Sequence, residues 1–323
     1  MKFTKRNNLP PKETEVTDLG LGNKVLDKGH RVINRDGSFN VRRKGLPFFE
    51  SFSVYHWLIS MSWMKFCLLI LAAYLVVNIF FATLYFIGGD SNFEGMVFTN
   101  EFDRFLNNFF FSTQTFTTVG YGRINPVGVY ANIVSSIESL AGLLSLALAT
   151  GLLYGRFVKP VAKIIYSEKA VIAPFNDITG FQFRIANKRY DHQMVDVEVE
   201  VMLSHVKNEL RSFYLLKLEY PKINFFTSTW TVNHPIDKES PIYRMTGEEL
   251  KEMDAEFFVL LKGFDDTFAQ IVHSRSSYKY TEIEWGARFI SVYGRADDGM
   301  TLIELDKISE YEKVVLPKTT NDD

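Results

Sequence analysis

The sequence predicts a membrane protein of mixed class, in which membrane-spanning α-helices are followed by a soluble all-β domain. Residues 66–87 carry no charged side chain, and residues 130–154 carry one, Glu138. From residue 160 onward no comparable apolar run recurs. As helices the two runs are about 33 and 37 Å long, enough to cross a hydrocarbon core of about 30 Å. The first run starts too late and is too long for a cleaved signal peptide.

The placement of basic residues predicts how these helices cross the membrane. Residues 1–65 contain twelve Lys and Arg, and further basic residues follow the second apolar run closely. The segment 88–129 contains two basic residues beside several acidic ones. Because Lys and Arg are enriched on the cytoplasmic side, we expect a multi-pass protein of the cell inner membrane with both termini cytoplasmic. The net charge of −2 implies no general affinity for nucleic acid.

The pattern of residues 160–323 changes to that of strands. "VDVEVEV" at 195–201 alternates valine with acidic residues, as a half-buried strand does. "SFYLLKLEY", "YTEIEW" and "RFISVYG" have a similar character, and "TGEELKEMD" carries the capping-box pattern of one short helix. Many short strands with one helix predict an immunoglobulin-like β-sandwich over residues 160–323.

The chain before the first span divides into two parts. Residues 1–46 are polar and are expected to be mostly extended or mobile. Residues 47–64 are rich in Phe, Tyr and Trp, which predicts an interfacial helix along the inner leaflet. The alternative is that this segment extends the first membrane helix at its N-terminus.

The segment between the two spans is too apolar for a solvated loop. Residues 103–116 have the length of a short helix, and residues 118–122 are Thr-Val-Gly-Tyr-Gly. Non-helical backbone at membrane depth is tolerated only where it is buried in protein or lines a water-filled path. We therefore expect a re-entrant helix at 103–116, membrane helices at 65–88 and 128–158, and a membrane domain covering 65–159.

The Thr-Val-Gly-Tyr-Gly motif is the known filter sequence of potassium channels and is identified by that match. In such a filter, backbone carbonyls replace the water that K⁺ sheds, and glycine supplies backbone angles forbidden to other residues. The preceding helix would aim its negative C-terminal end at the cavity. One chain supplies one loop, so a closed ring of carbonyls requires a homotetramer. The expected filter residues are Thr118, Val119, Gly120, Tyr121 and Gly122, with K⁺ at the first four and the Val and Tyr side chains packed behind.

Beyond the motif, the sequence resembles the prokaryotic inward-rectifier potassium channels over most of residues 34–295. The resemblance implies a tetramer with two membrane helices per chain, a slide helix at 47–64 and a cytoplasmic immunoglobulin-like domain that continues the pore. It also implies passive K⁺ conduction gated at the inner helix, with K⁺ as the transported ion and no organic cofactor. The matching stretches are "NRDGSFNV" (34–41), "YHWLISMSW" (55–63), "FRIAN" (183–187), "WTVNHPIDKESPIY" (230–243) and "RSSYKYTEIEWGARF" (275–289).

Glu138 is a carboxylate inside a membrane helix, which makes it a functional candidate. It is expected to brace the filter from behind, to line the cavity, or to be partly hydrated near the outer end of its helix. The resemblance favours bracing, because the position linked to rectification falls at Leu146. Gln114 stands where relatives often carry glutamate, and we expect Arg123 together with Glu138 to compensate.

The inner part of the second span supplies candidates for the cavity and gate. They are Gly142, Leu146, Thr150 and Tyr154. Gly142 is either a hinge or a small residue that permits close helix packing. Tyr154 is either the inner constriction implied by the resemblance or an interfacial aromatic anchor.

The resemblance also bears on rectification. Leu146 is apolar where strongly rectifying relatives are acidic, so strong block by internal Mg²⁺ or polyamines is not expected. Asp196 and Glu282 match acidic positions of the cytoplasmic pore, and weak rectification is expected from them. The alternative is that both belong to solvated strand faces. Block by Ba²⁺ is also expected.

Basic residues near the inner membrane face are expected to attract anionic, phosphoinositide-like lipids, at about 1 kcal/mol per charge. The alternative is an anchor that only follows the positive-inside pattern. The candidates are Arg42, Arg43, Lys44, Arg156, Lys159 and Lys163.

Other functions are less consistent with the sequence. The six histidines show no metal-ligand spacing, and no nucleophile–base arrangement is found, so no enzyme is expected. A membrane-anchored sensor, with a ligand-binding β-domain, needs neither a re-entrant helix nor Gly-Tyr-Gly within residues 103–122. The intact motif also argues against a non-selective cation pore.

Overall fold

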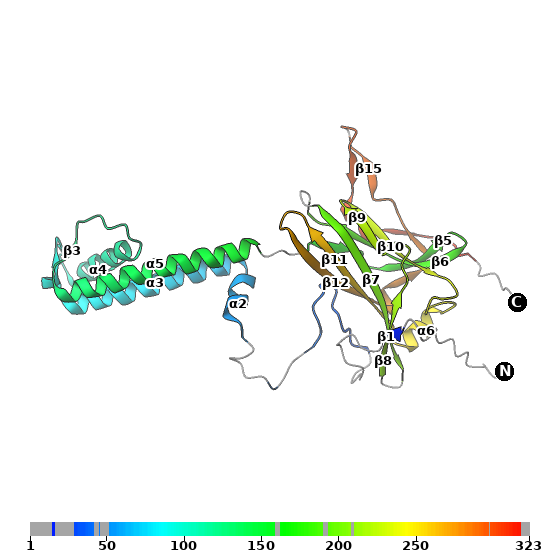
Figure 1. Cartoon of the computed structure of the whole chain (residues 1–323), viewed down its shortest axis with the longest axis horizontal. Coiled ribbons are helices and arrows are strands. Elements are labelled where there is room, and N and C mark those ends of the chain that lie inside the picture. The colour runs from blue at the N-terminus through cyan, green and yellow to red at the C-terminus, as the bar shows by residue number, and fades with distance from the viewer. Residues whose placement is uncertain are drawn as a thin grey trace. The chain divides into compact units, whose positions relative to one another are not determined.

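The chain forms two compact units, one α-helical and one built mainly of strands (Figure 1). The structure is a computed structural model that describes residues 15–16, 29–41, 45, 52–158, 162–189, 193–207, 210–296 and 298–317. The helical unit spans Lys44–Lys159. The β unit combines Pro160–Asp323 with the N-terminal segment Met1–Arg43.

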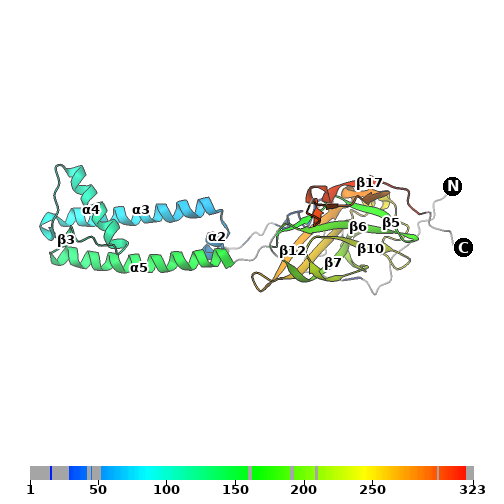
Figure 2. The ribbon, with the colours of Figure 1, turned by 90° about the horizontal axis from the view of Figure 1, so that it is seen from above.

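The helical unit contains two long helices that lie side by side and a shorter helix packed against both (Figure 2). Within the described residues, α3 and α5 are the helices long and apolar enough to cross a membrane. The elements are α2 (Val54–Ser60), α3 (Trp63–Gly88), η2 (Asp90–Asn92), β2 (Phe93–Glu94), α4 (Glu101–Phe116), β3 (Asn125–Pro126) and α5 (Val129–Val158).

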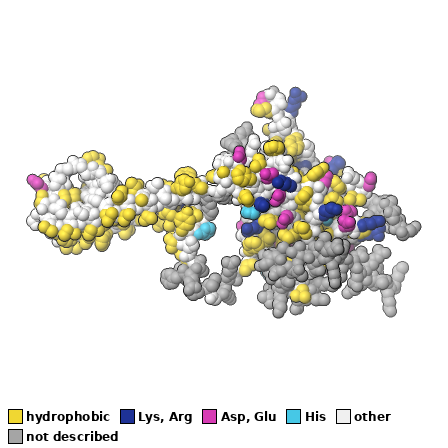
Figure 3. All heavy atoms as spheres, in the orientation of Figure 1, with side chains coloured by type: hydrophobic (Ala, Val, Ile, Leu, Met, Phe, Trp, Pro, Cys, Tyr) yellow, Lys and Arg dark blue, Asp and Glu magenta, His cyan; other side chains and the backbone are white. Residues whose placement is uncertain are grey.

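The outer surface of these long helices is apolar. Exposed side chains along them include Leu68, Val76, Phe80, Leu140 and Leu148. Figure 3 shows hydrophobic side chains along the helical unit, whereas Lys, Arg, Asp and Glu gather over the β unit. An apolar helix surface without protein cover suits hydrocarbon, and the helices satisfy their own backbone hydrogen bonds there.

The segment before the first span forms a helix separate from α3. At the start of α2 the Ser53 side chain accepts from the His56 N–H at 3.3 Å. Met61 and Ser62 are extended, with ψ of 162° and 151°, and this breaks the helix before Trp63. The structure therefore has a short helix before α3 that is not continuous with it. The expected range 47–64 is longer than the helix found, and its first five residues lie outside the described part.

The other helix boundaries differ from the expected ones by one or two residues, for local reasons. α4 begins at Glu101, two residues before the expected 103, because the Asn100 side chain caps it by accepting from Asp103 N–H at 2.8 Å. α3 begins two residues before the expected 65, and α5 begins one residue after the expected 128.

The β unit is a sandwich of two main sheets. One has the order β1-β8-β7-β11-β12 with β9 added on β7, and the other has the order β10-β6-β5-β13 with β4 added on β6. Neighbouring strands are antiparallel except for β13 on β5. The strands are β1 (Glu15–Val16), β4 (Ile164–Tyr166), β5 (Ala170–Phe175), β6 (Ile178–Asn187), β7 (Met194–Lys207), β8 (Leu210–Leu216), β9 (Lys222–Phe226), β10 (Thr229–Ile236), β11 (Glu256–Asp265), β12 (Gln270–Lys279) and β13 (Ile283–Trp285).

Smaller elements complete this unit. The helix α6 carries the capping box expected from the sequence, formed by Thr246 and Glu249. The hairpin of β15 and β16 projects from the sandwich (Figure 1). These elements are α6 (Gly247–Glu252), η3 (Tyr280–Glu282), β14 (Ala287–Phe289), β15 (Tyr293–Arg295), β16 (Thr301–Ile303), η4 (Leu305–Ser309) and β17 (Tyr311–Lys313).

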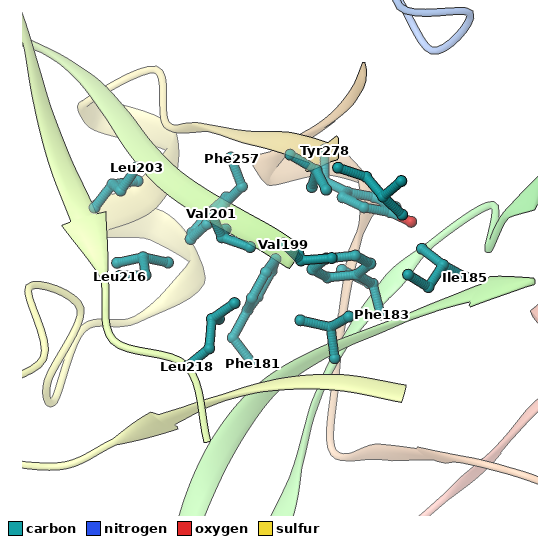
Figure 4. Close-up of a cluster of buried hydrophobic side chains, with 14 of the residues drawn as sticks. Phe181, Phe183, Ile185, Val199, Val201, Leu203, Leu216, Leu218, Phe257 and Tyr278 are labelled. Atoms are coloured by element: carbon teal, nitrogen blue, oxygen red, sulfur yellow. The ribbon is translucent and has the colours of Figure 1, made fainter. Parts of the chain in front are cut away.

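The core lies between the two sheets. The rings of Phe181 on β6 and Phe257 on β11 stack with centroids 4.3 Å apart, and both side chains are buried. Val199 and Val201 of the alternating strand point into the same cluster, so their acidic neighbours face outward (Figure 4). The predicted fold class, membrane helices followed by an immunoglobulin-like β-sandwich, is confirmed.

Part of the N-terminal segment is docked onto the sandwich. Within residues 29–41, Ile33 is buried against Phe258. The carboxylate of Glu256, which is fully buried, accepts from the Val32 N–H at 3.1 Å and from the Ile33 N–H at 3.4 Å. This part of the polar N-terminal region is therefore bound by a strand side chain, which composition alone did not predict.

The C-terminal strand β17 is tied to the sandwich by a carboxylate between two lysines. Glu284 on β13 accepts from Lys169 Nζ at 2.9 Å and from Lys313 Nζ on β17. These two ammonium groups lower the pKa of the Glu284 carboxyl to about 2.

Replacing Glu284 is expected to remove a pH-dependent part of the stability. A depressed carboxyl pKa contributes stability above the unfolded value, near 4.5, and loses it as pH falls toward 2. Glu284→Gln should therefore melt below the wild type at pH 6, with a difference that shrinks steadily between pH 4.5 and 2. Thermal unfolding followed by circular dichroism at several pH values checks this. A difference independent of pH would contradict it.

Candidate functional site

Residues 117–122, which include the expected filter, follow the C-terminal end of α4 and have φ angles of alternating sign. Within residues 117–122, φ is positive at Thr118 (60°), Gly120 (51°) and Gly122 (77°). An ordinary extended chain turns successive carbonyls to opposite sides, and a change in the sign of φ at every second residue lets them face one side. Thr118 is not glycine, so its conformation costs about 1 kcal/mol or more, and such strain clusters at functional sites.

The start of the filter is fastened to the last turn of α4. The Gln114 carbonyl accepts from Val119 N–H at 2.9 Å and from Gly120 N–H at 3.4 Å. The Gln114 side chain makes no hydrogen bond within residues 52–158, all of which are described. The backbone carbonyl of Gln114, and not its side-chain amide, therefore fixes the start of the expected filter.

The apolar filter side chains are uncovered in a single chain. Val119 is 52% exposed and Tyr121 is 79% exposed. Their expected packing behind the filter is thus not made by any part of the described residues 52–158.

Glu138 is enclosed where the three helices α3, α4 and α5 meet. Its carboxylate accepts from Ser112 Oγ on α4 and from the Tyr85 hydroxyl on α3, each at 2.5 Å. Ser112 Oγ also lies 3.1 Å from Asn78 Oδ1 on α3. Since Glu138 and Asn78 are both fully buried, this geometry corresponds to the bracing alternative and not to a hydrated or cavity-lining carboxylate.

The expected partnership between Arg123 and Glu138 is not formed. Arg123 Nη2 donates instead to Asn107 Oδ1 on α4, at 3.3 Å. Glu138 already accepts from two hydroxyls and has no exposed surface that the guanidinium of any chain could reach. Arg123 therefore does not act on this carboxylate directly.

Gly142 is a point of close contact between α5 and the end of α4. A Cβ atom built there would lie 2.0 Å from the Phe116 carbonyl oxygen. No side chain fits without separating the two helices, because the obstacle is backbone. This geometry favours the packing alternative over a hinge.

The remaining cavity and gate candidates share one face of α5. Leu146, Thr150 and Tyr154 follow one another at intervals of four residues, which places them on one helix side. Leu146 is 66% exposed and Tyr154 is 69% exposed, and Thr150 is exposed as well. One chain leaves this face open, as a face turned to a shared axis would be.

The basic residues expected to face lipid differ in exposure and in hydrogen bonding. Lys163 is exposed, as expected of a residue available to lipid. Arg156 is only partly exposed, and its guanidinium donates to the carbonyls of Leu58 at 2.5 Å and Met61 at 2.7 Å; its lipid-facing role stays a prediction. Arg42, Arg43, Lys44 and Lys159 lie outside the described residues.

Asp196 on β7 is exposed but paired. It forms an ion pair with Lys222 at 3.1 Å, next to Glu198 and Lys262 on the same face. Its φ is +51°, at a bulge where the pairing of β7 with β11 shifts register. The acidic charge at this position is therefore partly balanced within the chain.

Glu282 forms ion pairs with the docked N-terminal segment. Its carboxylate pairs with Arg31 and with Arg35, the latter at 2.8 Å, and accepts from Lys279 N–H at 2.9 Å. The two guanidinium groups balance the charge of Glu282. Its carboxylate is therefore neither a free acid nor a fully solvated one in this chain.

Comparison with known proteins agrees with this arrangement. Residues 164–323 match the family model described as the inward rectifier potassium channel C-terminal domain, and residues 61–159 match the model described as ion channel. The chain is 38% identical over 288 residues to the inward rectifier potassium channel Kirbac3.1 of Paramagnetospirillum magnetotacticum, covering 87% of this chain and 95% of that protein.

The chain belongs to the inward rectifier potassium channel family.

More distant relatives of the family extend the same match. Identity is 24% over 319 residues to the ATP-sensitive inward rectifier potassium channel 8 of Homo sapiens, covering 89% of this chain and 75% of that protein. It is also 24%, over 316 residues, to the G protein-activated inward rectifier potassium channel 3 of Mus musculus, with 89% and 78% covered. The predicted resemblance is confirmed, and the family places the chain in a membrane. Potassium channels are not enzymes, in agreement with the prediction.

The partners of Glu138 could not be predicted from the sequence. Asn78 interrupts the apolar run 66–87, but a single Asn in a sequence does not show which residue its side chain contacts. Ser112 and Tyr85 carried no signal, because Ser and Tyr are ordinary in membrane helices. Their roles follow from the three-dimensional packing of α3, α4 and α5.

Gly142→Ala is expected to destabilise the helical unit by about 1–3 kcal/mol, because the added methyl group forces the α4 carbonyl away. The matched control is Gly151→Ala on the same helix, where a Cβ meets nothing within 4 Å. The control should be neutral or stabilising by up to about 1 kcal/mol, as Ala replaces Gly in a helix. Thermal unfolding in detergent micelles measures both, and equal melting of the two variants would contradict the close-contact argument.

Proposed function

We propose that four copies of this chain form a potassium-selective pore. The observation that carries the proposal is the backbone of residues 117–122, where positive φ at every second residue follows the re-entrant helix α4. Four such segments around one axis would replace the hydration shell of K⁺ with carbonyl oxygens at Thr118, Val119, Gly120 and Tyr121. K⁺ is then the transported ion, moving passively down its gradient, and no organic cofactor is required.

The homotetramer is supported by what a single chain leaves open. The filter side chains Val119 and Tyr121 are exposed, and so is the Leu146–Tyr154 face of α5. In a closed ring the filter side chains would be covered by neighbouring chains, and the α5 faces would line a central cavity. Cyclic symmetry uses the same surfaces in each copy and leaves none of them unpaired.

We propose an inner-membrane position with both termini in the cytoplasm. The charge asymmetry supports it: residues 1–65 carry twelve Lys and Arg, whereas the segment between the spans carries two. The β unit is then cytoplasmic and continues the pore. Anionic or phosphoinositide-like lipids would meet Lys163 at the inner face, together with the basic residues 42–44.

Glu138 is proposed to brace the filter. It holds Ser112 on α4, and α4 in turn fixes the filter through the Gln114 carbonyl. A buried carboxylate with two hydroxyl donors gives charge-assisted hydrogen bonds, which are stronger than neutral ones. The α4 helix is thereby held to α5, and through Tyr85 to α3.

Rectification is proposed to be weak. Leu146 offers no charge to internal Mg²⁺ or polyamines, Glu282 is neutralised by Arg31 and Arg35, and Asp196 is balanced by Lys222. Gating is proposed at Tyr154, the innermost exposed residue of the cavity face. A ligand or lipid shifts this gate only as far as it binds open and closed states unequally.

The purified protein in liposomes is expected to carry K⁺ faster than Na⁺, with block by external Ba²⁺. The filter accepts K⁺ because its carbonyls match the shed hydration shell. Flux of each ion into vesicles down an inward gradient of that ion measures this, in several lipid mixtures and with Tyr154→Ala as a gate-opened control. Equal K⁺ and Na⁺ flux would point to a non-selective pore. Absence of flux from both proteins would favour the membrane-anchored sensor.

Glu138→Gln is expected to reduce K⁺ over Na⁺ selectivity roughly tenfold, since the lost charge-assisted bonds loosen α4 behind the filter. Ser112→Ala should act in the same direction with a smaller effect. The matched control is Ser136→Ala on α5, whose hydroxyl is exposed and bonds only to its own helix at Asn132 O. Flux ratios in liposomes decide the matter. Selectivity unchanged in Glu138→Gln would remove the bracing role.

A further inference from the structure

The chain that leaves the expected filter is paired with the chain that follows α3. β3 pairs antiparallel with β2, and the Asn92 carbonyl accepts from the Val127 N–H at 2.9 Å. A Cβ atom on Gly95 would lie 2.0 Å from the Arg123 carbonyl oxygen, so the two segments touch there without room for a side chain. We call residues 90–95, which contain η2 and β2, the strap. The strap therefore contacts the chain directly after the filter motif.

Arg104, near the start of α4, fastens the strap to the end of α3. Its Nε atom donates to Asp90 Oδ1, in the first residue of the strap, at 2.7 Å. Its Nη2 atom donates to the Phe86 carbonyl at 3.3 Å, and its guanidinium carbon lies 4.3 Å from the centroid of the Phe86 ring. The last carbonyls of a helix lack partners within it, so a cation at this end of α3 is favourable. One side chain of α4 thus holds both the strap and α3.

The contacts of Arg104 differ in how strongly water screens them. Its side chain is 17% exposed, whereas that of Glu101, which pairs with it at 3.1 Å, is 74% exposed. An ion pair with so exposed a partner contributes little to stability. The pair with Asp90, whose side chain is 40% exposed, and the two contacts with Phe86 therefore supply most of the attachment.

A second contact joins the start of α4 to the chain after the filter. The Asn107 side chain, one turn beyond Arg104, accepts from Arg123 Nη2 at 3.3 Å and donates to the Asp103 carbonyl at 2.8 Å. The first turns of α4 are therefore linked to the residue after the filter by Asn107, and to the strap by Arg104.

The two ends of the expected filter differ in how they are held. At the start of the filter the Gln114 carbonyl accepts two backbone N–H groups. At the other end, Tyr121 and Gly122 make one hydrogen bond within the described residues 52–158, which the Gly122 carbonyl accepts from Asn125 Nδ2 at 3.2 Å. This end is therefore held mainly through the chain that follows it, and so through the strap.

We infer that Arg104 is a positioning residue for the end of the filter at Gly122 and acts through the strap. In the proposed pore, the carbonyl oxygens of four chains face one axis and repel one another, and a bound K⁺ offsets this repulsion. When K⁺ is scarce, contacts within the protein have to keep the ring of carbonyls in shape. The inference rests on the proposed function, because it treats residues 118–122 as the filter, and it adds a role for the segment between α3 and α4.

Mass action separates this role from a general loss of structure. K⁺ that binds only the intact filter stabilises it more as the K⁺ concentration rises, so added K⁺ should offset a weakened strap. A variant that only assembles poorly loses the same fraction of its current at every K⁺ concentration.

Three variants test the inference. Arg104→Gln removes the guanidinium and its contacts with the strap and α3. Arg104→Lys keeps a charge for Asp90, but it lacks the planar fork and the flat face that meet the end of α3. Gly95→Ala leaves Arg104 in place and adds a methyl group against the Arg123 carbonyl oxygen, so it disturbs the strap by a second route.

The experiment records single channels in planar bilayers that have the same K⁺ concentration on both sides, varied over a wide range. N-methyl-D-glucamine keeps the ionic strength constant, and the measured quantity is the open probability. Every protein also carries Tyr154→Ala, so that the proposed inner constriction does not limit the current. The matched control is Arg288→Gln in the β unit, where an exposed guanidinium pairs with Glu312 at 2.7 Å. Size-exclusion elution establishes which variants are assembled.

Arg104→Gln and Gly95→Ala are expected to raise the K⁺ concentration of half-maximal open probability roughly tenfold, for the loss of hydrogen bonds to a charged group. Arg104→Lys should raise it less, and Arg288→Gln should leave it unchanged. An unchanged half-maximal concentration in an assembled Arg104 variant, or an open probability reduced by the same factor at every K⁺ concentration, would overturn the inference. Absence of K⁺-selective current from both the wild type and Tyr154→Ala would instead contradict the proposed function.

Discussion

The packing of the helical unit depends on the hydrogen bonds that the carboxylate of Glu138 accepts. Tyr85 of α3 and Ser112 of α4 both donate to it, and it belongs to α5, so one fully buried group joins all three helices. A charged group without these partners would be strongly unfavourable inside a membrane. The two hydroxyl donors therefore lower the free energy of burying the carboxylate. The carboxylate in turn fixes α4, which the expected filter segment follows.

A second junction lies at the other end of α5 and is built around a basic side chain. There Arg156 is surrounded by helix-terminal carbonyls and aromatic rings. Both junctions use one titratable side chain to gather backbone or hydroxyl groups from several helices. Between them, Gly142 brings α5 against the end of α4 where no side chain fits. Contacts on α5 thus hold both α2 and the end of α4.

Much of the architecture was predictable from the sequence, because it follows from composition and period. The apolar runs predicted α3 and α5, the alternating valines predicted β7, and the Thr-Glu spacing predicted the N-terminal cap of α6. What escaped prediction were partners far apart in the chain. Arg156 was grouped with lipid-facing cations because sequence shows charge but not direction, and Arg123 was expected to act together with Glu138 in place of the salt bridge absent at Gln114. The capture of Glu282 by residues 31 and 35 likewise required the fold.

The exposure of Val119 and Tyr121 has a consequence for biogenesis. In the proposed tetramer, a single chain would hold the positive-φ backbone at Thr118 and the exposed side chains of the filter at membrane depth until neighbouring chains cover them. The selective element would then belong to the assembly and not to the subunit. Its formation would follow mass action among inserted chains, so dilution in the bilayer would remove the filter before it unfolds the subunit.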